Sequence, residues 1–284
     1  MKRLSPKLTQ TLAYIFIITS TLIVILPILG VLFLIIKRGL PAINWEFLTQ
    51  MPKMGMKAGG IFPAIVGTFY LIIGTLIFSL PLGVLAAIYL VEYARENIFT
   101  RIIKLSIVNL AGIPSIVYGL FGLGLFVIFL HFGTSILAGS LTLAIMSIPV
   151  VVTATKEALE SVPNSFREVS LSLGATKWQT IRHAVLPYAL PGIITGTILS
   201  LSRAAGETAP ILFTVAAFYL PRLPRSIFDQ VMALPYHLYV ISTQVPNMPL
   251  KLSYGTALVL LGLVLFLNLW AVIIRTHFRK KKKW

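Results

Sequence analysis

Six long apolar runs dominate this chain, and they constrain its fold more than any other feature. Each run has the roughly 20 residues that a helix needs to cross the hydrocarbon core of a bilayer. A segment in that core must satisfy its backbone hydrogen bonds internally, so each run is predicted to be a helix. The runs cover residues 11–36, 61–91, 105–130, 136–155, 188–220 and 254–274. The predicted fold class is therefore an all-α integral membrane protein with six transmembrane helices.

Composition agrees with this class and excludes several others. Only 11% of the residues are charged, against about 25% in soluble domains. The 24 Lys and Arg outnumber the 8 Asp and Glu, but they lie beside and between the apolar runs. Membrane proteins place them there, so we expect the lipid bilayer as a partner and no nucleic acid. The absence of cysteine excludes disulfides and cysteine-based metal sites.

The basic residues also predict the orientation of the spans. Sixteen lie at the two termini and in the loops after the second and fourth spans, whereas seven lie in the other loops. The positive-inside rule therefore predicts that both termini are cytoplasmic. Lys2, Arg3 and the basic run 279–283 belong to that side. We interpret the C-terminal run as a topology anchor on anionic lipid.

We divide the chain into three parts. Residues 1–60 hold the first span and an external loop, 61–275 form a core of five spans, and 276–284 form a basic tail. The external loops 37–60 and 221–253 are too long to be simple turns, and loops of that size usually have a function or are disordered.

The loop between the fourth and fifth spans, residues 157–187, carries a helical pattern. Pro163 favours the start of a first helix, and Gly174 favours a reversal of the chain after it. A second helix is predicted to begin near Lys177 and to end at Pro187. Apolar residues recur at helical spacing in both halves, at Phe166, Val169, Leu173, Ile181 and Val185. We predict a helix–turn–helix whose apolar stripe either packs on its own protein or docks into a groove on a partner.

The fifth run contains two charged residues in the stretch SRAAGETAP, 202–210. A charged Arg at the centre of a span costs at least about 2.5–3.5 kcal/mol, so Arg203 must face a partner or a wet cavity. Glu207 is one helical turn further on, on the same predicted face. Either the two residues form an ion pair that only makes the helix insertable, or they line a transport path in which Glu207 holds Arg203.

The chemistry of this stretch favours an anion. A guanidinium presents a planar fork of donors that suits a tetrahedral oxyanion, and Thr208 adds a hydroxyl. Gly206 allows close approach to the backbone. Pro210 lacks an N–H, so we expect the helix to bend there. These residues predict an anion pathway.

The loop resembles the EAA coupling loop of ABC importer permeases. That pattern is matched by Glu168, Val169 and Ser170, by Gly174 six residues after the Glu, with Ala175 beside it, and by Leu186 and Pro187. The chain departs from it at Val169, Ser170 and Ala184, where the family has two alanines and an isoleucine. The resemblance implies a type I importer architecture in which this loop fits a cleft on an ATP-hydrolysing subunit.

Three further stretches resemble the PstA-type permeases of phosphate importers: SRAAGETAPILFT, GGIFPAIVGT (59–68) and AGIPSIVYGLFGL (111–123). PstC-type permeases share the R-x-x-G-E-T core. The resemblance implies a multi-pass subunit of an ATP-driven inorganic phosphate importer in a bacterial or archaeal inner membrane. The implied partners are a PstC-type sister permease, PstB-type ATP-binding subunits and a PstS-type phosphate-binding protein.

Other functions stay open. The chain has no G-x-x-x-x-G-K-[ST] stretch, so we expect ATP hydrolysis on a separate subunit, no enzyme activity and no cofactor. It also lacks the zinc-protease motif H-E-x-x-H and the hydrolase motif G-x-S-x-G. The alternatives are a permease for another oxyanion (phosphonate, sulfate or molybdate) and a passive anion channel.

Overall fold

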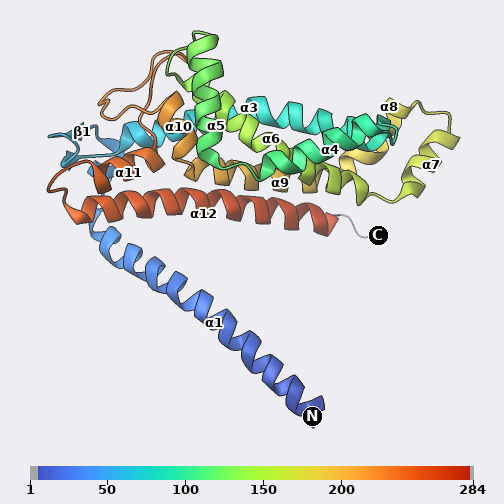
Figure 1. Ribbon diagram of the computed structural model, residues 1–284, viewed down its shortest axis with the longest axis horizontal. Helices are drawn as coiled ribbons and strands as arrows, with labels where there is room; N and C mark the ends of the chain where they lie inside the picture. Colours follow the sequence, from blue (N-terminus) through green and yellow to red (C-terminus); the bar gives the residue numbers. More distant parts are fainter. Residues whose placement is uncertain (1–5, 282–284) are drawn as a thin grey trace.

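The computed structural model of the protein describes residues 6–281 as an elongated bundle of helices (Figure 1). Within that range, five helices are long and apolar enough to cross a membrane, or six if one bent pair counts as a span. This result confirms the predicted fold class. Lys2, Arg3 and the last lysines of the tail, 282–283, lie outside the described residues. The straight spans are formed by α1 (Pro6–Gly39), α3 (Phe62–Ile88), α6 (Ile136–Glu160), α9 (Leu186–Gly206) and α12 (Leu250–Lys281).

Small residues bring the central helices α3, α6 and α9 together. A Cβ on Gly83 of α3 would lie 2.6 Å from Val151 Cγ1 of α6, and one on Gly192 of α9 would lie 2.7 Å from Ala158 Cβ. Membrane helices associate through such close contacts because lipid provides no hydrophobic drive between them. The α6 helix therefore forms the centre of a tight three-helix core.

The third apolar run is not one continuous helix. It forms α4 (Ile98–Ala111) and α5 (Ser115–Gly122), which meet at 104° and continue into the wide-turned segment η3 (Leu123–Phe129). Figure 1 shows α5 standing across the bundle. Pro114 has no N–H and disfavours helical backbone at Ile113, so the helix breaks before it.

The second helix of the loop after α6 does not end at Pro187, contrary to expectation. The chain runs from α8 (Lys177–Thr180) through the wide-turned segment η4 (Ile181–Val185) directly into α9. The Leu186 N–H donates to Ile181 O, five residues back, as in a π-helix. This wider turn gives room for the ring of Pro187, which would clash with a carbonyl in a regular α-helix.

The two long loops that we expect to be external form a cap over the N-terminal end of α3. The first holds η1 (Leu40–Ala42), α2 (Trp45–Thr49) and the short hairpin β1 (Pro52–Lys53) and β2 (Ala58–Gly59), and the second holds α11 (Leu234–Thr243). Phe47 of the first loop and Met232 of the second are buried in one cluster. The Leu234 N–H donates to Thr68 Oγ1 of α3 at 2.8 Å, which fixes the cap to the span.

One buried histidine makes this cap sensitive to acid. His237 of α11 is 3% exposed, and burial lowers its pKa from 6.5 to about 4. The fold holds the neutral ring, so stabilisation is complete above about pH 6.5 and is lost as the pH falls towards 4, up to about 3 kcal/mol. We expect amide exchange in 234–243 to accelerate over this range, and His237→Gln to flatten the change.

The control is His131→Asn, because His131 is exposed and lies at a positive φ that Asn tolerates. Comparison of each variant with the parent at each pH removes the intrinsic pH dependence of exchange. The same pH profile in the parent and in His237→Gln would contradict this role of the buried ring.

The first span extends away from the rest of the bundle. Figure 1 shows α1 diverging from α12, and its spanning window has no buried residue. It contacts the bundle at its C-terminal end, where a Cβ on Gly39 would lie 2.6 Å from Tyr254 O. The start of α1 and the end of α12 point towards the same end of the molecule as α8, which agrees with an even number of spans (Figure 1).

Candidate functional site

The loop after α6 forms the helix–turn–helix that its sequence pattern predicts. Pro163 is extended (φ −56°, ψ 141°) and precedes α7 (Asn164–Ser172). Gly174 takes φ +84°, a left-handed conformation that favours glycine, and Thr176 then caps α8 with a capping box. Figure 1 shows α7 and α8 projecting from one end of the bundle.

The apolar stripe of this loop is divided between two surfaces. On the inner side, the centres of the Phe166 and Tyr188 rings lie 4.7 Å apart, and Ile181 and Val185 are buried. On the outer side, Val169 is 59% exposed and Leu173 is 82% exposed. No residue of α7 is buried. The loop therefore packs on its own bundle and also offers an apolar surface that nothing in the described chain covers.

The residues that match the EAA pattern lie at both ends of this unit. Glu168 is exposed on α7, and the Ser170 hydroxyl lies 2.9 Å from the Thr180 hydroxyl of α8. The Ala175 N–H donates to Ser170 O across the turn at 3.2 Å. Leu186 and Pro187 lie in the first turn of α9. The pattern thus closes the turn and joins it to the fifth span.

The charged pair lies where α9 ends. Arg203 is in its last turn, and Glu207 follows with extended backbone (φ −74°, ψ 131°). The expectation that both lie on one helix is therefore wrong, yet Arg203 Nε still donates to Glu207 Oε1 at 3.3 Å. The Arg203 side chain is 50% exposed, and that of Glu207 is 17% exposed. Within residues 6–281, neither Nη atom of Arg203 donates a hydrogen bond, so both Nη groups remain available to a ligand.

The break lies before Pro210 rather than at it. Glu207 and Thr208 separate α9 from the short helix α10 (Ala209–Thr214), whose first turn accommodates Pro210 because no N–H is needed there. Thr208 is half-buried at this junction. A Cβ on Gly119 of α5 would lie 2.8 Å from Ala209 O, so the bent third span packs tightly against α10. The predicted run 188–220 is therefore two helices.

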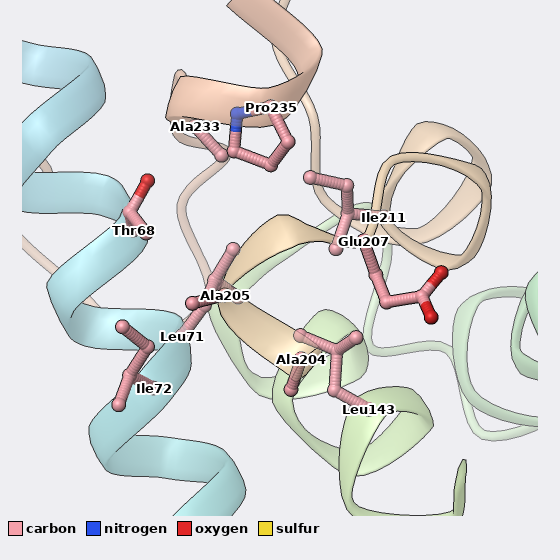
Figure 2. Close-up of a pocket in the computed structure, with 10 residues that line it drawn as sticks. All are labelled: Thr68, Leu71, Ile72, Leu143, Ala204, Ala205, Glu207, Ile211, Ala233 and Pro235. Atoms are coloured by element: carbon pink, nitrogen blue, oxygen red, sulfur yellow. The ribbon is translucent and has the colours of Figure 1, made fainter. Parts of the chain in front are cut away.

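A small cavity between α9, α3 and the second long loop lies beside Glu207. It measures about 10 Å³ and is lined by Ala204, Ala205 and Glu207 together with Leu71 and Ile72 of α3. Those two residues lie about 15 Å along α3 from its N-terminal end, at 1.5 Å per residue. Figure 2 shows the Glu207 carboxylate pointing away from the apolar centre of this cavity. Arg203 is thus in the last turn of the candidate span that ends at Gly206, and Glu207 follows this span with its carboxylate directed away from the cavity.

Two further charged residues were missed by sequence reasoning. Arg167 of α7 forms an ion pair with Glu92, which lies in the wide-turned segment η2 (Tyr89–Tyr93) at the end of α3. They are 75 residues apart, so no local pattern links them. The described residues contain no group of three or more His, Asp or Glu that would hold a metal ion.

The fold and the site define a multi-pass membrane permease. Residues 79–284 match the family described as "binding-protein-dependent transport system inner membrane component". The chain belongs to this family, and it is an ABC importer permease subunit. Members work with an ATPase and a substrate-binding protein, and the permease itself is a membrane component without catalytic activity.

Curated relatives match nearly the whole chain. The probable ABC transporter permease protein YqgI of Bacillus subtilis is 33% identical over 98% of this chain and 99% of its own length. The phosphate transport system permease protein PstA 1 of Mycobacterium tuberculosis is 35% identical over 99% of this chain and 92% of its own. PstA of Mycobacterium leprae is 37% identical, over 95% and 89% respectively.

Solved structures share the fold. A bacterial alginate ABC transporter in complex with an alginate-bound periplasmic protein superposes with a TM-score of 0.69 at 14% identity, covering 95% of this chain and 96% of that one. The inward-facing MetNI methionine ABC transporter superposes with a TM-score of 0.57 at 18% identity, covering 77% and 94%. At these identities the likeness concerns the fold alone.

Proposed function

We propose that the chain is the PstA-type permease subunit of an ATP-driven importer of inorganic phosphate. Several relatives named as phosphate transport system permeases match it over most of their length. The observation that carries the proposal is the half-exposed Arg203 in the last turn of a span. Its Nε donates to Glu207, and both of its Nη groups remain available to a ligand. Such a residue faces a wet cavity or a partner rather than lipid.

The geometry suits an oxyanion in transit. The two Nη groups of Arg203 can donate to two oxygens of a phosphate, as in a bidentate guanidinium–phosphate pair. Glu207 orients the guanidinium through Nε and leaves the rest of the fork open. Thr208 supplies a hydroxyl at the break beside it. A nearby carboxylate also weakens anion binding, which suits release more than storage.

We also propose where the other subunits of the importer would bind on the surface of the chain. A PstC-type permease would cover the α9 face that carries Arg203, so that the pathway runs between the two subunits. PstB-type ATPases would receive α7 and its exposed Val169 and Leu173. A PstS-type binding protein would dock on the ordered external cap. We further propose that residues 61–275 form the permease core and that both termini are cytoplasmic, in a bacterial or archaeal inner membrane.

Reconstitution tests this function directly. The chain is co-expressed with its sister permease and ATPase, placed in vesicles, and supplied with the binding protein and labelled phosphate. We expect uptake that requires ATP and that excess sulfate, molybdate or phosphonate does not suppress. Accumulation of one of those oxyanions instead would assign another substrate, and flux without ATP would indicate a passive channel.

A further inference from the structure

The Arg167 guanidinium connects three elements at the cytoplasmic end of the bundle. Its Nε and Nη2 donate to Glu92 Oε1 of η2, at 3.0 and 2.8 Å. Nη2 also donates to Leu159 O in the last turn of α6 at 3.0 Å, and Nη1 donates to Val162 O, two residues after α6, at 2.8 Å. The second Nη1 hydrogen faces Asn164 Oδ1 at 3.4 Å. All five donors of the side chain are thereby used.

The surroundings of this ion pair set it apart from an ordinary surface bridge. The side chains of Arg167 and Glu92 are only 17% and 8% exposed, whereas the Glu96 and Lys104 pair nearby leaves Glu96 81% exposed. A charge at 8% exposure requires a partner, because an unpaired buried charge is strongly unfavourable. Arg167 also satisfies carbonyls at the C-terminal end of α6, where helical partners run out.

A second contact joins the same two regions. Lys177, the first residue of α8, places its Nζ 5.0 Å from the centre of the Tyr93 ring, next to Glu92 in η2. Glu92 and Tyr93, which are adjacent in η2, thus contact both helices of the loop. Glu92 forms an ion pair with α7, and Tyr93 forms a cation–π contact with α8. The chain sequence connects this loop only to α6 and α9, so η2 adds a third attachment.

We propose that Arg167 and Glu92 are positioning residues that make α3 move with the coupling helix α7. The inference rests on the proposed coupling of α7 to an ATPase. Without this clamp, a displacement of α7 would act on α6 and α9 through the backbone and reach α3 only through side-chain packing. With it, α3, α6 and α9 move as one body, and the Arg203 site between α9 and α10 moves relative to the sister subunit.

The test combines a distance measurement with a coupling measurement in the assembled importer. Because the chain has no cysteine, nitroxide labels can be placed on single cysteines at Arg95, just after η2, and at Ser165 of α7, both exposed. We expect one narrow label-to-label distance that is the same with and without ATP. Glu92→Gln should broaden it and lower the phosphate transported per ATP hydrolysed by at least about fivefold.

The matched control is Glu96→Gln, which removes an acid from an exposed pair four residues away and should change neither readout. Arg167→Lys keeps the positive charge but loses the planar set of guanidinium donors. It should therefore transport more phosphate per ATP hydrolysed than Arg167→Gln. If Glu92→Gln leaves the distance distribution and the coupling ratio unchanged, the clamp has no such role. If it lowers complex yield and uptake together at a constant ratio, the pair is only structural.

The distance measurement does not require phosphate. A complex in which the label-to-label distance stays constant with and without ATP, but which transports no phosphate, would overturn the proposed substrate and leave the clamp standing. A complex that transports phosphate while ATP separates the labels would overturn the clamp and leave the function standing.

Discussion

Replacing Arg203 with Gln is expected to reduce ATP-dependent phosphate uptake by at least about 100-fold. Two charge-assisted hydrogen bonds to an oxyanion contribute roughly 3–6 kcal/mol in sum, and each 1.4 kcal/mol is a factor of ten. The variant should assemble normally, because the half-exposed guanidinium has one hydrogen-bonded partner, Glu207, in the described chain. Uptake into vesicles at low external phosphate is the measurement.

Two companion variants sharpen this prediction. Arg203→Lys keeps the charge without the planar fork and should retain intermediate uptake. Arg101→Gln removes an exposed charge from the first turns of α4 and should transport normally. Normal transport by Arg203→Gln would remove Arg203 from the pathway. An equal loss in Arg101→Gln would show that total charge, rather than the site, is responsible.

Replacing Leu173 with Asp is expected to release the ATPase from the permease. Leu173 is 82% exposed just after α7, so its side chain contributes almost nothing to the stability of the lone chain. Burial of a leucine in a partner's groove contributes about 1.5–3 kcal/mol, and a buried unpaired carboxylate adds a further penalty. We expect co-purification of the ATPase to weaken by about 10- to 100-fold.

Leu173→Met is the matched control because it keeps an apolar side chain of similar volume. It should retain the ATPase and transport normally. Full retention of the ATPase by Leu173→Asp would show that α7 does not dock through this residue. Loss of the permease itself from the membrane would instead indicate that Leu173 is needed for folding, against its exposure in the structure.

Local physical rules explain how far the sequence predicts the structure. Five of the six runs, the start at Pro163 and the left-handed turn at Gly174 follow from hydropathy, a fixed φ and the missing Cβ of glycine, and the structure has them. The same rules mislead at prolines, because they do not decide between a bend, a break and a wide turn. Pro114 follows a 104° break, whereas Pro187 is accommodated by the wide turn η4.

Long-range contacts lie beyond such rules. The pairing of Arg203 with Glu207 is local and could be predicted, although the helix end between them was not. The pairing of Arg167 with Glu92 joins residues 75 positions apart, and only the folded bundle brings them together. The cap formed by the two long loops likewise depends on the hydrogen bond between Thr68 and Leu234, which no spacing in the sequence predicts.

The accessibility of position 203 tests most directly whether a wet pathway runs past this arginine. Since the chain has no cysteine, Arg203→Cys creates a single thiol in this subunit. Only a thiol that reaches water ionises and reacts quickly with a charged, membrane-impermeant thiol reagent. We predict rapid reaction in the assembled importer in at least one nucleotide state. A thiol that stays unreactive with and without ATP would place residue 203 against lipid or sealed protein, and would contradict the pathway.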